Sequence, residues 1–245
     1  MKIFSRFSLT ICLSFFIINY SEAQFMHYTQ NGAMDNALSY SRLIIQKTEG
    51  GVYKQVGVFK VVGTSYLFGE KNKGNLFSPE AKAYNIFLSY NTYNQEVEFY
   101  SSGNPDKPLV KEPRTVDSFL IQENISLGIN HPLKFVYGTH LGSSEKFYFL
   151  EIYAGPQYSI YKRYKSDLGY VATNYVQSDL RQFDLLYDYY YTDSGKGGPK
   201  KIKANSSSII KEFKNIKDIS PVFTNEAFAT NQEEALRVAF EYLNK

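Results

Sequence analysis

Residues 83 to 104, AYNIFLSYNTYNQEVEFYSSGN, decide the fold class of this chain. Apolar and aromatic residues fall on even positions between residues 84 and 90, and on odd positions between residues 93 and 99. Alternation with a period of two is typical of a strand with one buried face. A slip of one residue turns every side chain to the other face, so the change of phase predicts a bulge or tight turn near residues 90 to 94. The stretch therefore predicts two strands that meet at a turn.

The composition extends this prediction to most of the chain. The 245 residues include 22 Tyr and 19 Phe but no Trp, and aromatic residues are enriched in strands. Short alternating segments follow one another without helical patterns between them, which favours an antiparallel sheet over a parallel one. We therefore predict a mainly β (β-rich α+β) fold, with an antiparallel curved sheet or barrel-like domain. Further strands are expected at residues 52–62, 115–122, 134–137, 146–154, 158–164 and 183–192.

Two segments are expected to lie outside the sheet. Residues 69–74, GEKNKG, are polar and glycine-flanked, which is typical of a solvated loop. Residues 101–114 contain three prolines, and each removes a backbone donor, so no regular element is expected there.

The C-terminal region is expected to form short helices that pack on the sheet. Serines 206–208 are predicted to cap a short helix, and Asn231 is predicted to cap a second one with an apolar stripe. That stripe consists of Leu236, Ala239, Phe240 and Leu243.

The N-terminus has the layout of a secretory signal peptide. Lys2 and Arg6 precede a short apolar run, and the small residues around Ala23 predict cleavage before Gln24. The only cysteine, Cys12, lies in this leader, so the exported chain has no thiol for a disulfide or a metal. We divide the chain into a signal peptide (1–23), a lead-in segment (24–48), an antiparallel β domain (49–204) and a C-terminal helical segment (205–245).

Charge and hydropathy limit the environments and partners that are expected for the exported chain. Without the leader, 222 residues remain, and the 27 basic and 24 acidic residues fall to 25 and 23, a formal charge of +2. That balance does not indicate nucleic-acid binding. No later apolar run is long enough for a transmembrane helix. The expected location is the periplasm or the extracellular space.

The sequence offers little support for catalysis. It has no metal-binding H-E-x-x-H spacing and no G-x-S-x-G nucleophile elbow, and the glycine-rich run near residue 196 lacks the spacing of a phosphate-binding loop. The remaining route is a pair of carboxylates, Glu96 with Glu98 or Asp184 with Asp188, because each pair shares one strand face. Alternating acids on an exposed strand face are common, so we expect no enzymatic activity, no cofactor and no metal site.

Two groups of residues are candidates for binding. Tyr84, Tyr90 and Tyr93 have apolar rings with polar tips that suit sugars or lipid headgroups, and the alternative is that they pack in the sheet. A basic cluster suits an anionic envelope component such as lipid phosphate or acidic polysaccharide, and the alternative is a solvated sheet edge. The cluster consists of Lys196, Lys200, Lys201 and Lys203.

Several of these segments together resemble a family of uncharacterised secreted proteins of Bacteroidota-type bacteria. The resemblance lies in the run from Val62 to Leu67 (VGTSYL), in Gly74, and in the YN pairs followed by Glu96-Val97-Glu98-Phe99. The later stretches FLEIY (149–153) and SIYKRY (159–164) are similar too. The resemblance implies export and a β-rich fold, and it brings no established activity.

The sequence therefore predicts a non-enzymatic, secreted envelope protein that acts as a binding or scaffold component. Its partner would be an envelope protein or a lipid or glycan ligand, and not a nucleic acid. The alternative is a carrier that holds an apolar ligand such as a lipid in a cavity of the curved sheet, which would require a continuous apolar cavity.

Overall fold

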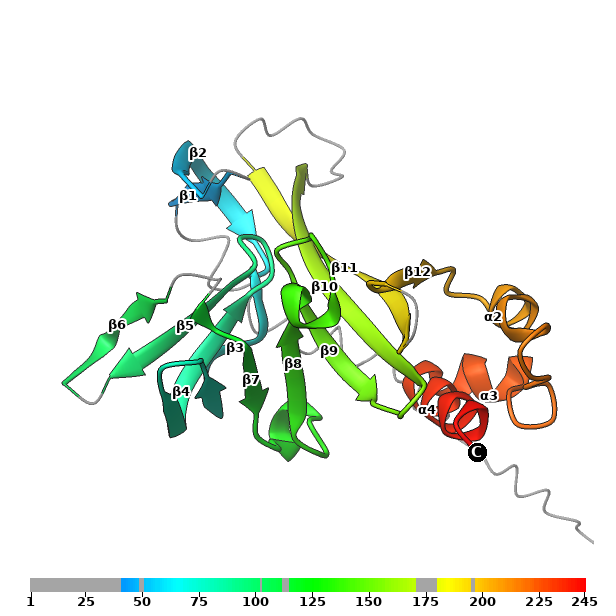
Figure 1. The fold of residues 1–245 in the computed structure, drawn as a ribbon. Coiled ribbons are helices and arrows are strands. Elements are labelled where there is room, and N and C mark those ends of the chain that lie inside the picture. The colour runs from blue at the N-terminus through cyan, green and yellow to red at the C-terminus, as the bar shows by residue number, and fades with distance from the viewer. Residues whose placement is uncertain (1–40, 49–50, 102, 112–114, 171–179, 195–196) are drawn as a thin grey trace, which may run out of the picture.

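The computed structural model describes residues 41–245 apart from 49–50, 102, 112–114, 171–179 and 195–196. Strands account for 52% and helices for 18% of the described residues, which confirms the mainly β prediction. One sheet of twelve strands dominates the structure, and short helices follow it at the C-terminal end (Figure 1).

The strands form one antiparallel sheet with a single parallel contact. Their spatial order is β1-β2-β11-β10-β9-β8-β7-β3-β4-β5-β6, with β12 added beside β11. Only the short contact between β2 and β11 is parallel. The strands are β1 (Ser41–Lys47), β2 (Tyr53–Val62), β3 (Tyr66–Phe77), β4 (Lys82–Asn91), β5 (Glu96–Ser101), β6 (Asn104–Val110), β7 (Ser118–Ile121), β8 (Leu133–Tyr137), β9 (Tyr148–Tyr153), β10 (Tyr158–Tyr170), β11 (Leu180–Asp193) and β12 (Lys200–Ile202).

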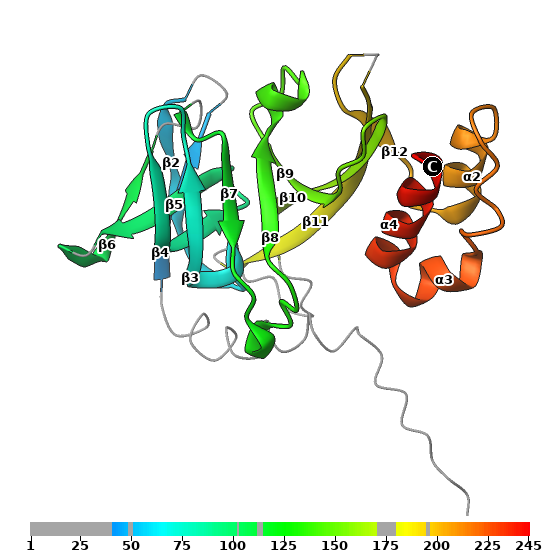
Figure 2. The same ribbon diagram turned by 60° about the horizontal axis from the view of Figure 1, so that its bottom comes forward.

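The sheet is strongly curved but does not close. Its two ends are β1 and β6, and they do not pair with each other. The bend brings the arm that contains β3, β4 and β5 opposite the arm that contains β9, β10 and β11 (Figure 2). The curved-sheet prediction is confirmed.

The stretch from residue 83 to residue 104 forms β4, a turn and β5, as predicted. Leu88 pairs with Phe99 and Tyr90 pairs with Val97, so these four side chains lie on the same face of the sheet. Residues 92–95 form the turn that absorbs the change of phase.

The prediction of a loop at residues 69–74 is wrong, because β3 runs through them. Leu67 pairs with Tyr90 and Asn72 with Leu88, so four residues of β3 stand opposite the single residue Ser89. This wide bulge accommodates the polar residues within the strand. Gly74 is needed beyond it, because a Cβ there would lie 2.2 Å from the backbone oxygen of Leu120 on β7.

The prediction that residues 101–114 lack a regular element is also wrong. β6 forms there and pairs with β5 from Val110 to Asn104. Pro105 and Pro108 are tolerated because β6 is an edge strand, where missing donors cost least.

The sheet also begins earlier than the sequence indicated. β1 lies within the segment expected to be a lead-in, and it pairs along its length with β2. A bulge between Ile44 and Ile45 interrupts the register of this hairpin.

Aromatic side chains fill the space between the two arms of the sheet. Phe119 and Phe135 stack with their ring centroids 4.6 Å apart, and Tyr90 and Tyr148 pack around them at 5.1 to 5.8 Å. All four residues are fully or almost fully buried. We call this cluster the sheet core.

The turn between β4 and β5, residues 92–95, connects the sheet core to the opposite arm. The buried Gln95 amide donates to the backbone oxygens of Thr92 (2.7 Å) and Tyr164 (2.9 Å), and its Oε1 accepts the Tyr90 hydroxyl at 2.7 Å. Thr92 and Ser166 bond through their hydroxyls at 2.6 Å and through the backbone at 3.1 Å. We call residues 92–95 the closing turn, because these bonds join β4 and β5 to β10 across the bend.

The same segment binds the β1–β2 hairpin. The Asn94 side chain accepts from the backbone N–H of Lys47 at 3.1 Å and donates to the carbonyl of Ile45 at 3.2 Å. Next to the closing turn, the Glu96 carboxylate accepts the Lys47 ammonium at 2.7 Å and the Tyr53 hydroxyl. Side chains, rather than a ladder of backbone bonds, therefore hold the end of β1 against the opposite arm.

Three helices pack against one face of β10 and β11, around Ile160 and Tyr189. They are α2 (Ser206–Phe213), α3 (Asn225–Thr230) and α4 (Gln232–Leu243). Asn231 caps α4 through a 3.0 Å bond to the Glu234 N–H, as predicted. α2 is capped by Asn205 rather than by the serines, and α3, which Thr224 caps, is not among the predicted helices. The predicted apolar stripe of α4 is buried against the sheet together with Ile160 and Tyr189.

Both ends of α4 are fastened to the sheet. Near its N-terminus, Glu233 accepts the nearly buried Lys162 ammonium at 2.6 Å, and this ammonium lies 4.2 Å from the ring centroid of Tyr187. After its C-terminus, the Asn244 Oδ1 accepts the N–H groups of Gln157 (2.9 Å) and Tyr158 (3.0 Å). The helices and the sheet therefore form one packed body.

Replacing Gln95 tests the role of the closing turn. Gln95→Leu removes the acceptor of the buried Tyr90 hydroxyl and one donor each from the carbonyls of Thr92 and Tyr164, of which the Thr92 carbonyl keeps the Ser166 N–H, so we expect a loss of about 2 to 4 kcal/mol in the free energy of unfolding. Urea denaturation followed by circular dichroism measures it. The exposed Gln46→Leu is the control and is expected to change stability by less than about 0.5 kcal/mol. Equal losses in both variants would contradict this role.

Candidate functional site

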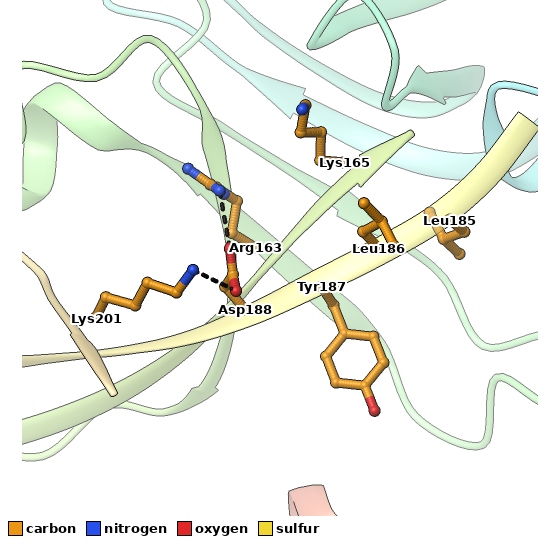
Figure 3. Close-up of a pocket in the computed structure, with 7 residues that line it drawn as sticks. All are labelled: Arg163, Lys165, Leu185, Leu186, Tyr187, Asp188 and Lys201. Atoms are coloured by element: carbon orange, nitrogen blue, oxygen red, sulfur yellow. Dashed lines mark hydrogen bonds and ion pairs between the residues drawn. The ribbon is translucent and has the colours of Figure 1, made fainter. Parts of the chain in front are cut away.

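A basic hollow on β10, β11 and β12 is the best candidate for a binding site. It has a volume of about 480 Å³ and lies on the face of β10 and β11 that points away from the sheet core and the helices. Figure 3 shows Arg163 and Lys201 converging on Asp188, with Lys165 and Leu186 on the same side and the Tyr187 ring on the other. Its lining consists of Arg163, Lys165, Leu185, Leu186, Tyr187, Asp188 and Lys201.

The strand register explains why these side chains meet. Arg163 of β10 pairs directly with Asp188 of β11, and Lys165 pairs with Leu186, so all four side chains project from one face. Lys201 pairs with Tyr190, two residues beyond Asp188, and reaches the carboxylate diagonally.

Ion pairs balance the charges around the hollow. The Asp188 carboxylate lies 2.9 Å from Nη2 of Arg163 and 2.7 Å from Nζ of Lys201. Lys165 pairs with Asp167 at 2.6 Å. The lysine side chains are 48% and 59% exposed, and exposed ion pairs contribute only about 0 to 1 kcal/mol. An incoming anion can therefore exchange these pairs at low cost.

Arg163 is held more firmly than the two lysines. Its guanidinium lies 4.7 Å from the ring centroid of Phe147 and 5.3 Å from that of Tyr190, and it also pairs with Glu145 at 3.2 Å. The hollow thus combines one fixed cation with two that can move toward a ligand.

The structure separates the lysines of the predicted basic cluster. Lys201 lines the hollow. Lys200 is exposed with its ammonium 5.9 Å from the Tyr191 ring centroid, and Lys203 is exposed beyond the end of β12. Lys196 lies outside the described residues. Of the lysines in the cluster that the structure describes, one belongs to the site.

The three predicted tyrosines have different environments. Tyr90 is fully buried in the sheet core, so its ring packs against other side chains and is not accessible to a ligand. Tyr93 is partly buried and packs edge-on against Phe183, with centroids 5.4 Å apart. Tyr84 is 59% exposed and leans against Phe77 at 5.9 Å. They do not form one stacked surface.

The Glu96 and Glu98 side chains share a face, as predicted, but they are buried rather than exposed. Glu96 is held by Lys47 and Tyr53, as described above. Glu98 accepts the Tyr66 hydroxyl at 2.9 Å on both of its oxygens. Burial raises the pKa of Glu98, and burial together with the neighbouring carboxylate raises the pKa of the Tyr66 hydroxyl. Both carboxylates therefore accept hydrogen bonds from other strands: Glu96 from the β1–β2 hairpin and Glu98 from β3.

The other candidates for chemistry are dispersed. Asp184 is exposed and accepts the Gln182 amide, whereas Asp188 belongs to the hollow. His140 pairs with Asp117 at 2.8 Å on the surface. Within the described ranges, no group of three or more His, Cys, Asp or Glu side chains is arranged to hold a metal ion.

Sequence reasoning missed Arg163 and Lys165 as site residues. The predicted strand ended at residue 164, one position before Lys165, and the predicted cluster was restricted to residues near one another in the chain. The alternation of Tyr161, Arg163 and Lys165 was the available signal. Their partner strand could not be identified from the pattern alone.

Comparison of the chain with protein-family models, with curated proteins and with solved structures gives no match. None of the helices in the described part of the chain has both the length and the apolar character needed to cross a membrane. The assignment of function therefore depends on the geometry of the surface.

Glu98 is expected to make stability fall as the pH rises through the acidic range. Its raised pKa means that the folded state retains the proton after the unfolded state has lost it, so its favourable contribution is present below the unfolded pKa and is lost as the pH rises through the folded value. We expect the free energy of unfolding of the native protein to fall relative to Glu98→Gln as the pH rises above about 4, where the unfolded Glu98 carboxyl begins to ionise. Urea denaturation at each pH measures this difference. A difference that stays constant or grows in favour of the native protein would contradict the prediction.

Proposed function

We propose that this protein is a non-enzymatic binding component of the cell envelope that recognises an anionic group at the basic hollow. The single observation that carries the proposal is the convergence of Arg163 and Lys201 on Asp188 in a hollow that Lys165 also lines. Guanidinium and ammonium groups are the donors that bind phosphate and carboxylate. The shared chemistry is a phosphate or carboxylate on a lipid headgroup or an acidic glycan.

The proposed location follows from the N-terminal sequence. The basic residues, apolar run and small residues before Gln24 are those of an export signal. Export places the chain in the periplasm or outside the cell, where anionic lipids and glycans are abundant. The proposal therefore keeps the predicted location and replaces the tyrosines with the hollow as the binding surface.

The packing supports a binding site on the outer surface over the alternative of an enclosed carrier. The space between the arms of the sheet, where a lipid would have to lie, contains the stacked rings of Phe119 and Phe135 with Tyr90 and Tyr148. A ligand there would have to displace fully buried side chains, each worth about 1.5 to 3 kcal/mol of burial.

The surroundings of the acidic residues support a role without catalysis. Glu96 and Glu98 are already engaged by Lys47, Tyr53 and Tyr66. A general acid or base must reach a substrate proton directly or through one water, and buried carboxylates in such contacts are not positioned for that.

Titration of the exported chain, residues 24–245, with two small probes tests the hollow. Glycerol phosphate represents a lipid headgroup and digalacturonate an acidic glycan. We expect one of them to shift the amide resonances of Arg163, Leu186 and Asp188 in heteronuclear NMR spectra. Lys165→Gln with Lys201→Gln removes two cationic contacts and is expected to weaken that binding about tenfold or more.

The matched control carries the same change in charge next to the hollow. Lys200→Gln with Lys203→Gln removes two exposed lysines that do not line it, and the affinity is expected to stay within about twofold. Equal weakening by both double variants would indicate general charge attraction and would overturn the site. Absence of binding by both probes would overturn the proposed anionic ligand.

A further inference from the structure

Exposed apolar side chains are concentrated on the β1–β2 hairpin. Six of the fifteen exposed large apolar side chains in the described residues lie between Leu43 and Val58. Leu43 and Val58 are cross-strand partners, and Ile45 follows on the same side of β1, with Val56 next to it at the bulge. We call Leu43, Ile45, Val56 and Val58 the hairpin patch. Contiguous exposed apolar surface of this kind marks an interaction site.

The charged residues within the two strands of the hairpin are all basic. β1 and β2 contain Arg42, Lys47, Lys54 and Lys60, and neither strand contains Asp or Glu. Lys54 and Lys60 are exposed, and Lys47 forms an ion pair with Glu96. The surface around the patch is therefore apolar and cationic.

The opposite face of the hairpin is fixed to the body of the protein. Ile44 is buried, and so is Val61 where β2 enters the sheet beside β11. Asn94 and Glu96 hold the other end, as described for the closing turn. The hairpin lies at the periphery, away from the helices (Figure 1). A surface held in this way presents the patch outward without having to fold on binding.

We infer that the β1–β2 hairpin docks the protein on an anionic lipid surface. Apolar side chains that enter the interface and basic residues that face acidic headgroups are the two components of interfacial binding. Charge decides between lipid and a second copy of the chain, because pairing two such hairpins brings their basic residues together and an anionic bilayer neutralises them. The inference does not depend on the basic hollow, which lies on β10, β11 and β12.

Sedimentation with vesicles tests this inference on the exported chain, residues 24–245. We expect it to bind phosphatidylcholine vesicles that contain about 30% phosphatidylglycerol, and to bind pure phosphatidylcholine more weakly. Leu43→Thr with Val58→Thr keeps strand-forming residues but removes apolar area, and it is expected to reduce partitioning about tenfold on the anionic vesicles. Lys54→Gln is expected to reduce it roughly fivefold on the anionic vesicles only.

The opposite edge of the sheet provides a matched control. Leu109 and Val110 on β6 are 47% and 44% exposed, compared with 49% and 58% for Leu43 and Val58. Leu109→Thr with Val110→Thr is therefore expected to partition as the native protein does, and thermal unfolding checks that each variant is folded. Absence of vesicle binding, or an equal loss in both double variants, would overturn the inference. A dimer in light scattering that Leu43→Thr with Val58→Thr dissociates would assign the patch to a second copy and would overturn it too.

Discussion

The hydrogen bonds of the closing turn are the constraint on which the rest of the structure depends. A curved sheet that stops short of closing leaves its arms free to separate, unless something other than a backbone ladder connects them. Gln95 and Thr92 supply that connection to β10, and Asn94 and Glu96 supply it to the β1–β2 hairpin. Gln95 adopts a φ of 55°, an unfavourable conformation for a residue with a side chain, and its three buried hydrogen bonds offset that cost.

The closing turn also accounts for where the surfaces of the molecule lie. With the arms held together, the aromatic rings fill the interior and the acidic pair is enclosed between hairpins. The opposite face of β10 and β11 remains for the basic residues, and the outer side of β1 and β2 remains for exposed apolar ones. The two surfaces are distinct in composition: one holds exposed ion pairs, and the other combines exposed apolar side chains with basic residues. Both surfaces carry the basic residues on which the proposed binding to anionic groups depends.

Alternation along the chain was sufficient to predict most of the strands, because a period of two reports burial directly. It failed where polar residues lie inside strands, as in the bulge of β3, and where an edge position tolerates proline, as in β6. The basic hollow could be predicted only in part. Lys201 stood out in a local cluster, but its proximity to Arg163 and Lys165 depends on the pairing of strands that are distant in sequence. The burial of Glu96 and Glu98 likewise depends on tertiary contacts that the pattern does not contain.

A distance measurement between the β1–β2 hairpin and the arm that bears the closing turn tests the central claim most directly. Residues 24–245 contain no cysteine, so Gln46→Cys on β1 and Lys73→Cys on β3, both at exposed positions, can carry a unique pair of spin labels in a protein of these residues. Pulsed dipolar spectroscopy then reports the separation of the hairpin from the arm that bears the closing turn. A single narrow distribution is the result that the account predicts. A broad or bimodal distribution would mean that the closing turn does not hold the arms together, and would contradict it.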